Sequence, residues 1–182
     1  VKACLEAGKS VVTSNKELVA TKGFELLEAA RRNNVNFLFE ASVGGGIPIL
    51  RPINQCLAAN NVLEIAGILN GTTNYILTKM INEKTSFEQA LKQAQELGYA
   101  ERNPDSDVKG YDTCRKICIM SSLAYGKHIY PKNISTEGIE SIELSDVEYA
   151  SSAGYVIKLI GRTKKTTDDM LDIAVCPMLI RK

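Results

Sequence analysis

The spacing of apolar residues along the chain changes between a helical and a strand-like period. Apolar side chains recur every three or four positions, as in amphipathic helices, in residues 1–7, 24–34, 49–60 and 86–97. Short apolar or β-branched runs, typical of buried strands, occupy residues 10–14, 36–41 and 62–69. Two later runs, residues 155–163 and 170–180, flank a polar turn and predict a β-hairpin. This pattern predicts an α+β fold with a mixed β-sheet and helices mainly on one face.

Residues 98–116, GYAERNPDSDVKGYDTCRK, form the most informative stretch, which lies between two predicted helices. Its four carboxylates belong to Glu101, Asp105, Asp107 and Asp112. Because unpaired buried charges are costly, this loop must face water, a cation or a cationic ligand group. Asp112 and Lys116 are four residues apart, so they share one helix face if a helix begins near residue 109.

Three interpretations of this loop follow from spacing. The plainest is a solvated acidic loop with an ordinary ion pair, since exposed pairs are common and weak. A second is an EF-hand that starts at Asp105, but its twelfth position requires a bidentate Glu and is Lys116. We exclude the EF-hand because its cation would lie beside an ammonium group. The third is a site where carboxylates hold a ligand amine and a lysine handles a proton or an oxyanion.

Composition narrows the class of protein. The sequence has 182 residues, 45% hydrophobic and 24% charged, which suffices for a domain with a core. A net charge of +1 gives no electrostatic reason to expect nucleic acid or an acidic membrane surface as partner. We find neither a spanning apolar run nor a secretory signal. The five cysteines lack a C-x-x-C pair and indicate reduced thiols in a cytoplasmic protein, and the single histidine, His128, excludes a histidine-rich zinc site.

Two predicted strand-to-helix junctions carry further candidates. Lys16 follows the first strand, where open α/β sheets bind ligands, so it is a candidate for a cofactor or substrate contact or else a surface lysine. Residues 40–48, EASVGGGIP, contain three glycines that allow close backbone approach. Neither G-x-G-x-x-G nor a Walker pattern is present, so the phosphate signal is weak. The alternative is a tight turn into a helix with Pro48 in its first turn.

The helix starts are predicted from capping residues. Thr72 or Thr73 is expected to cap the helix after Asn70-Gly71, where free amides would favour a carboxylate, although simple capping is the alternative. Capping boxes are predicted at residues 85–88 and 145–148. Asp107 or Asp112 is expected to cap the helix that runs to about residue 125.

The central loop also resembles the signature of homoserine dehydrogenases, A-x-x-x-G-Y-x-E-x-x-P-x-x-D-x-x-G-x-D-x-x-x-K. Its positions are met by Ala94, Gly98, Tyr99, Glu101, Pro104, Asp107, Gly110, Asp112 and Lys116. The family often has Asp-Pro where this chain has Asn103-Pro104. Residues 67–76, GILNGTTNYI, resemble the segment that lines the substrate pocket in the same family. So long a signature is far more specific than a lone glycine motif.

The resemblance implies NAD(P)-dependent interconversion of L-homoserine and L-aspartate 4-semialdehyde, in the biosynthesis of threonine, methionine and isoleucine. It implies that Lys116 is the proton donor and that Lys16 lies where cofactor and substrate meet. The implied substrate-binding residues are Gly71, Thr72, Tyr99, Glu101, Asp107 and Asp112. The implied cofactor-binding residues are Lys16, Gly98 and Glu101.

A monovalent cation, usually sodium, is also implied at the glycine turn. Its ligands would be Glu40 and the backbone carbonyls of Val43, Gly45 and Ile47, since oxygen ligands suit a hard cation.

Residues 1–20 would be a remnant of the nucleotide-binding domain, and residues 21–182 a C-terminally truncated catalytic and dimerisation domain, so we expect a homodimer. Two other classes stay open: a Schiff-base lysine enzyme using Lys116 or Lys16, and a non-catalytic, metal-stabilised interaction domain.

Overall fold

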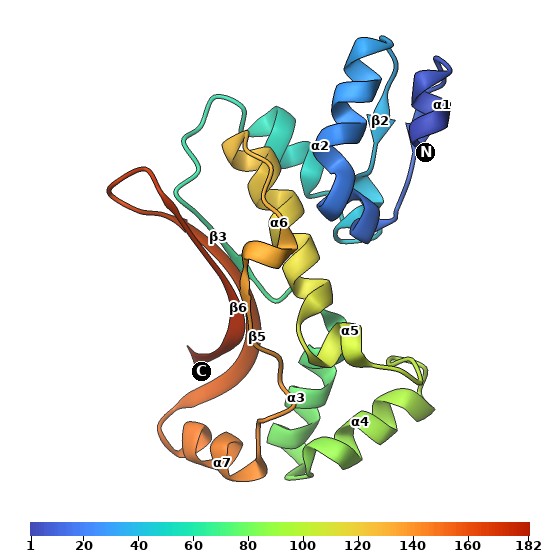
Figure 1. Ribbon diagram of the computed structural model, residues 1–182. Coiled ribbons are helices and arrows are strands. Elements are labelled where there is room, and N and C mark those ends of the chain that lie inside the picture. The colour runs from blue at the N-terminus through green and yellow to red at the C-terminus, as the bar shows by residue number, and fades with distance from the viewer. The chain divides into compact units, whose positions relative to one another are not determined.

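The computed structural model describes residues 1–182, and the chain divides into two compact units. Unit 1 comprises residues 1–65 and 115–133, and unit 2 comprises residues 66–114 and 134–182. One change of unit occurs inside helix α6 (Tyr111–Tyr125), whose first turn belongs to unit 2 and whose remainder belongs to unit 1 (Figure 1). None of the helices combines the length and apolar character needed to cross a membrane.

Unit 1 opens with a β–α–β arrangement of parallel strands joined by a helix. In the parallel pair, Val11 lies opposite Phe37. The connecting helix begins at residue 16 because the Asn15 side chain accepts a hydrogen bond from the Leu18 amide at 2.9 Å. The predicted strand-to-helix junction at Lys16 is therefore confirmed, and the amphipathic helix predicted over residues 24–34 is the later part of α2. The elements are α1 (Lys2–Glu6), β1 (Val11–Val12), α2 (Lys16–Arg32) and β2 (Phe37–Leu38).

The rest of unit 1 is less regular than its apolar pattern predicts. Strand β2 ends early and is followed by a 3₁₀ turn, η1 (Glu40–Ser42). The helix predicted over residues 49–60 is shorter and becomes a π-helix, η2 (Pro52–Cys56). Pro52 lies in the first turn, where proline is tolerated because an amide there has no partner within the helix. A 3₁₀ turn, η3 (Pro131–Asn133), ends the unit.

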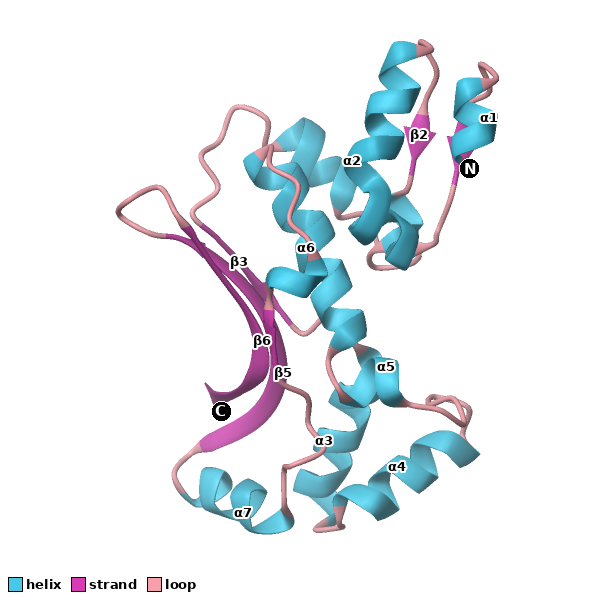
Figure 2. Ribbon diagram, viewed as in Figure 1, coloured by secondary structure: helices cyan, strands magenta, loops and turns pink.

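Unit 2 contains a four-stranded mixed sheet in the order β3-β5-β6-β4. The predicted hairpin is confirmed and longer than expected, with Tyr155 opposite Arg181 and Lys165 opposite Leu171. Strand β4 runs parallel to β6, and helices α3 and α7 pack against β5 (Figure 2). The predicted α+β fold class is thus confirmed. The strands are β3 (Glu64–Gly67), β4 (Ser135–Thr136), β5 (Tyr155–Lys165) and β6 (Leu171–Arg181).

The helix starts in unit 2 differ from the predicted caps. Helix α3 is capped by Asn70 rather than by a threonine, because the Asn70 Oδ1 atom accepts the Thr73 amide at 2.8 Å. Helix α4 is capped by Ser86 rather than Thr85, and α7 has its capping box at Glu143 and Asp146. The helices are α3 (Gly71–Glu83), α4 (Phe87–Glu96), α5 (Asp105–Val108) and α7 (Leu144–Ser152).

The acidic stretch is less of a loop than its composition suggests. Asp107 lies inside the short helix α5, and Asp112 lies in the first turn of α6, directly after Tyr111. Neither aspartate is therefore the residue that precedes α6, which is Gly110. Gly110 has a φ of +81°, a left-handed conformation that favours glycine and turns the chain from α5 into α6.

A close backbone contact fixes α5 next to β4. The Ile139 amide donates to the Val108 carbonyl at 2.8 Å, and the Glu137 amide donates to the Val175 carbonyl at 2.8 Å. Between them lies Gly138, where a Cβ atom would come within 2.1 Å of the Val108 carbonyl oxygen. Only glycine allows this approach. The segment that carries Asp107 is thereby held against the strand that precedes Gly138.

Candidate active site

Two of the four carboxylates of the acidic stretch converge on one amide in unit 2. The Asn70 Nδ2 atom donates to Asp107 Oδ1 at 2.6 Å and to Asp112 Oδ2 at 2.9 Å. Asp112 is 4% exposed and Asn70 is 5% exposed. The ends of three helices, α3, α5 and α6, thus bring together residues that are 37 and 42 positions apart. Asp112 also gains from its place in the first turn of α6, where the helix dipole favours a negative charge.

The other two carboxylates behave differently. Asp105 accepts a hydrogen bond from Lys109 at 2.8 Å, one helical turn later, and both side chains are partly exposed. This contact raises the pKa of the Lys109 ammonium. For Asp105, therefore, the ordinary ion pair on a helix face is the correct interpretation. Glu101 is exposed, and its backbone carbonyl accepts a hydrogen bond from the Gln95 side chain at 3.1 Å.

The start of α3 is tied to the residues that follow α4. The Thr72 hydroxyl donates to the Tyr99 carbonyl at 2.7 Å, and the Tyr99 ring meets the Tyr75 ring edge-on at 5.1 Å. Tyr99 remains 58% exposed, so its ring offers a surface for a ligand. Gly98, with a φ of +75°, ends α4 and turns the chain into this contact. Of the residues predicted to bind substrate, Gly71, Thr72 and Tyr99 thus lie in one neighbourhood of unit 2.

The two candidate lysines belong to unit 1 and are half-buried. Lys16 is the first residue of α2 and follows strand β1, as predicted. Lys116 lies on α6 four residues after Asp112, so both project from the same side of that helix. The residues next to the lysines, Glu17 and Arg115, form an ion pair at 3.7 Å. The helical turns that carry Lys16 and Lys116 are therefore neighbours within unit 1.

The glycine turn of unit 1 is closed by Glu40. Its carboxylate accepts the backbone amides of three successive residues, Ile49, Leu50 and Arg51, at 2.7 to 3.0 Å. The Ile47 amide donates to the Gly44 carbonyl at 2.5 Å. No group of three or more His, Cys, Asp or Glu side chains is placed to hold a metal ion. A cation at this turn would thus depend on backbone carbonyls.

Two polar residues of unit 2 were missed by sequence reasoning. Asn70 was treated as part of a turn, although Asn before a predicted helix is a preferred N-cap and could have been recognised as one. Lys158 lies in the strand predicted over residues 155–163, and no role is predicted for it. Its Nζ atom donates to Asn74 Oδ1 at 2.7 Å and to Thr78 Oγ1 at 2.8 Å, which fastens β5 to α3. Burial lowers the pKa of Lys158. No sequence pattern indicated its partners, because they are 80 and 84 residues away.

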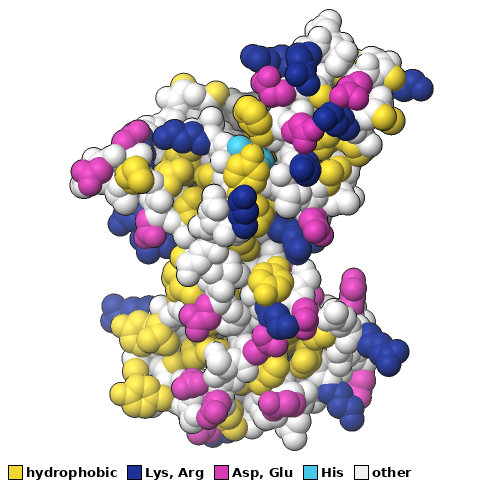
Figure 3. Space-filling view, viewed as in Figure 1, with side chains coloured by type: hydrophobic (Ala, Val, Ile, Leu, Met, Phe, Trp, Pro, Cys, Tyr) yellow, Lys and Arg dark blue, Asp and Glu magenta, His cyan; other side chains and the backbone are white.

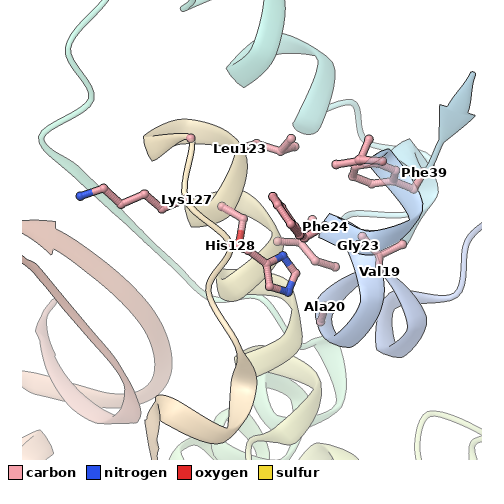
Figure 4. Close-up of a pocket in the computed structure, with 12 residues that line it drawn as sticks. Val19, Ala20, Gly23, Phe24, Phe39, Leu123, Lys127 and His128 are labelled. Atoms are coloured by element: carbon pink, nitrogen blue, oxygen red, sulfur yellow. The ribbon is translucent and has the colours of Figure 1, made fainter. Parts of the chain in front are cut away.

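A mainly apolar pocket of about 260 Å³ in unit 1 contains none of the predicted site residues. It lies between α2 and the end of α6 (Figure 4). The ring centroids of Phe24 and His128 are 6.3 Å apart there, and the two rings are tilted relative to each other. Burial lowers the pKa of His128, outweighing a hydrogen bond with the Ala20 backbone that raises it.

On the visible surface, acidic and basic side chains are interspersed, in keeping with the net charge of +1 (Figure 3).

Two family models match the chain in succession. Residues 1–40 match the NAD binding domain of homoserine dehydrogenase, and residues 48–182 match the family named homoserine dehydrogenase. The two matches together correspond to part of a dehydrogenase, with residues of a cofactor-binding domain followed by residues of a catalytic domain. More narrowly, the chain belongs to the homoserine dehydrogenase family.

Individual relatives agree with this assignment. The chain is 43% identical to the homoserine dehydrogenase of Bacillus subtilis over 97% of its own length and 40% of the relative's. It is 46% identical to that of Helicobacter pylori, over 99% and 42% of the two lengths. The chain therefore spans about 40% of the length of these curated relatives.

Solved structures show the same likeness. The homoserine dehydrogenase of Thiobacillus denitrificans matches with a TM-score of 0.96 and 41% identity, over 99% of this chain and 42% of that one. A hyperthermophilic archaeal homoserine dehydrogenase in complex with NADPH matches with a TM-score of 0.82 and 30% identity, over 98% and 51% of the two chains.

Proposed function

We propose that the full-length protein containing this chain is a cytoplasmic homoserine dehydrogenase. It interconverts L-homoserine and L-aspartate 4-semialdehyde with NAD(P) and serves threonine, methionine and isoleucine biosynthesis. The observation that carries the proposal is the pair Asp107 and Asp112, held by one amide and followed one helical turn later by Lys116. These residues occupy the signature positions of the family to which the chain belongs. Residues 1–20 are assigned to the cofactor domain and residues 21–182 to the catalytic domain, although the match to the NAD binding domain extends to residue 40.

The acidic residues are assigned to the α-ammonium group of the substrate. Glu101 and Asp112 bind it, with Asp107 in support, because charge-assisted hydrogen bonds to carboxylates are strong. Tyr99 contributes its exposed ring to the pocket. Gly71 and Thr72, at the start of α3, offer backbone amides to the substrate carboxylate. The Thr72 hydroxyl is engaged with the Tyr99 carbonyl, so we expect its amide rather than its hydroxyl to contribute.

Lys116 is assigned to proton transfer. When bound, NAD(P)H supplies a hydride to the aldehyde carbon, and negative charge then develops on the aldehyde oxygen. Lys116 donates a proton to that oxygen, which yields the alcohol, and takes the proton back in the reverse direction. Lys16 contacts both cofactor and substrate, and Gly98 and Glu101 contact the cofactor. A lysine in the second turn of α6 and one at the start of α2 suit these roles, since their helices meet through Glu17 and Arg115.

A sodium ion is assigned to the glycine turn, with Glu40, Val43, Gly45 and Ile47 as ligands. The residues fit such an ion because the turn can supply several backbone oxygens, which suit a hard cation. In support, Gly44 has a φ of +68°, and a Cβ atom there would lie 3.0 Å from the Ile47 carbonyl oxygen. That carbonyl is thus folded back over the turn. The ion would stabilise the entry into η2, which Glu40 also holds.

A homodimer is proposed through the catalytic domain. Leu179 and Ile180, near the end of β6, are 59% and 40% exposed. Consecutive residues of a strand point to opposite faces of the sheet, so each face has one exposed apolar side chain here, and exposed apolar surface can mark an interface. The family dimerises through the same sheet domain, as the sequence resemblance implies.

The proposed function is tested by measuring NAD(P)⁺-dependent oxidation of L-homoserine by the full-length protein. We expect reduction of the cofactor with homoserine and none with L-serine, which is one methylene shorter. Borohydride added during turnover should trap no covalent adduct, since the mechanism uses no Schiff base. A trapped adduct on Lys16 or Lys116, or an absence of homoserine oxidation, would overturn the proposal.

A further inference from the structure

Asn70 makes more contacts than a helix cap requires. Its Oδ1 atom accepts the Thr73 amide at 2.8 Å, and its backbone carbonyl accepts the Thr73 hydroxyl at 3.3 Å. These bonds alone satisfy the first turn of α3. In addition, the Nδ2 atom directs its two hydrogens at two different carboxylates, Asp107 and Asp112.

The orientation of this amide follows from chemistry. If the side chain were rotated by 180°, its oxygen would face the two carboxylates and its NH₂ group would face the Thr73 amide. All three contacts would then pair like with like, whereas in the observed orientation each donor meets an acceptor. The cap on α3 thus fixes which end of Asn70 points at the acidic pair. The start of α3 and the acidic pair are therefore coupled through a single side chain.

The acidic pair needs such a neighbour. Two carboxylates that approach one another repel, and the repulsion is stronger where water is scarce. Asp112 and Asn70 are almost fully buried, whereas Asp107 is half-buried. An amide that donates one hydrogen to each carboxylate offsets this repulsion and fixes the distance between them. It is neutral, so it adds no charge of its own to the pair.

We infer that Asn70 is a positioning residue, which holds Asp107 and Asp112 at a fixed separation to receive the substrate ammonium group. The inference rests on the proposed function, because it takes the ammonium group of homoserine as the ligand of the pair. Asn70 acts through the two aspartates and has no part in hydride or proton transfer. Its loss therefore weakens the binding of substrate and leaves the binding of cofactor unchanged.

The test uses Asn70→Ser in the full-length protein, with KM measured separately for homoserine and for NAD(P)⁺. Serine caps a helix as well as asparagine does, so α3 keeps its first turn. Its short hydroxyl cannot cap α3 and also reach both aspartates. We expect KM for homoserine to rise about tenfold or more, as for the loss of hydrogen bonds to charged groups. KM for NAD(P)⁺ and the melting temperature should change little.

Two further variants test whether the rise in KM for homoserine comes from the placement of the two aspartates, from impaired folding or from altered charge. Ser86→Ala removes the cap of α4. The Ser86 side chain contacts the Gln89 amide and the carboxylate of Glu88, which lies outside the acidic stretch of residues 98–116. Ser86→Ala should lower the melting temperature with KM for homoserine unchanged. Asn70→Asp keeps the shape and the cap but aims a third carboxylate at the pair, so KM for homoserine should again rise. A fall in that KM would mean that total charge matters rather than placement, and would overturn the inference.

The inference also fails if Asn70→Ser oxidises homoserine with the KM of the unchanged protein, or if the KM values for both ligands rise equally. In these cases the proposed function survives, because the unchanged protein is active. A protein that oxidises no homoserine before any substitution overturns the proposed function, and the inference with it.

Discussion

Lys158 on β5 donates a hydrogen bond to the side chain of Asn74 on α3, across 84 residues of sequence. A second bond joins the same ammonium group to Thr78 at 2.8 Å. Neither partner carries a charge, which is unusual for a half-buried lysine. The contact fixes α3, which Asn70 caps, to β5, one of the two inner strands of the sheet. The sheet and the candidate site are therefore joined through α3.

The first prediction concerns Lys158→Met, which keeps the length of the side chain and removes its hydrogen bonds. Asn74 and Thr78 then lose a charged donor, so we expect the free energy of unfolding to fall by about 1–3 kcal/mol. Chemical denaturation at pH 7 measures this. Lys132→Met is the matched control, because Lys132 contacts only the Tyr130 ring on the surface.

The sign of the pH dependence gives a second readout for the same variant. Burial lowers the pKa of Lys158 in the folded protein, so between that pKa and 10.5 the unfolded chain binds more protons. This lysine should therefore make the protein more stable as pH rises through that window, and Lys158→Met should remove that contribution. If the free energy of unfolding changes with alkaline pH in the same way in the unchanged protein and in Lys158→Met, the burial assigned to Lys158 would be contradicted.

The second prediction is that Lys116→Ala reduces turnover by roughly 100-fold or more, as for the loss of a general acid. Steady-state kinetics in both directions measures this, with melting temperature as a check on folding. Lys109→Ala serves as the control, since Lys109 is paired with Asp105 at the surface and should be dispensable. Turnover at the level of the unchanged protein in Lys116→Ala would refute the role of Lys116.

The third prediction concerns Glu101→Gln, which keeps the shape of the side chain and removes its charge. We expect Glu101→Gln to weaken the binding of homoserine more than the binding of NAD(P), because a charged partner of the ammonium group is lost. Isothermal titration with each ligand separates the two. Equal losses would indicate that Glu101 only orders the residues after α4. Glu96→Gln, at the exposed end of α4, is the control.

The fourth prediction tests the cation at the glycine turn. Gly44 and Gly46 both have positive φ values, but only at Gly44 would a Cβ atom meet the Ile47 carbonyl. Alanine should therefore strain the backbone at both positions and disturb the carbonyl ligands only at Gly44. We expect sodium chloride to raise the melting temperature above that in choline chloride, and Gly44→Ala to abolish the difference while Gly46→Ala keeps it. A melting temperature that is the same in both salts would contradict the site.

The fifth prediction is that this chain alone forms a dimer and binds NAD(P) poorly. The proposed interface lies in the sheet, whereas the matched part of the NAD binding domain covers only residues 1–40. Light scattering and a cofactor titration on the same sample measure both properties. A monomer would contradict the proposed interface, and tight binding of NAD(P) would contradict the expectation that residues 1–40, together with Gly98 and Glu101, bind the cofactor poorly by themselves.

The structure explains which of these features sequence reasoning could reach. The hairpin of β5 and β6 was predictable because its pairing is local and flanks a polar turn. The α+β class followed from periodicity in the same way. The neighbourhood of Asp107 and Asp112 was indicated by a signature, but the residue that joins them was not. Asn70 is 37 residues upstream of Asp107, and no local pattern indicates a contact across that distance.

Local chemistry also decided where helices begin and end. Helix α2 begins at Lys16, at the predicted junction, because Asn15 caps it, although the clearer apolar period starts eight residues later. The helix expected over residues 49–60 ends at Cys56 after a π-helical turn that includes Pro52. Periodicity reports which face is buried, whereas the ends of a helix depend on single hydrogen bonds. The roles of Glu101 and the sodium ligands stay predictions that the experiments above will decide, and the role of Lys16 stays a prediction.

Gly138 affects how the loss of activity in variants of this protein should be interpreted. Any side chain there would have to displace backbone atoms of Val108, which accepts the Ile139 amide in the same contact. A saturation screen for growth without added threonine or methionine should therefore find Gly138 as intolerant as the acidic residues. It would do so although Gly138 has no functional group to offer a ligand. An inactive variant at this position would reveal geometry rather than chemistry, and mapping catalytic residues by loss of activity alone would count it wrongly.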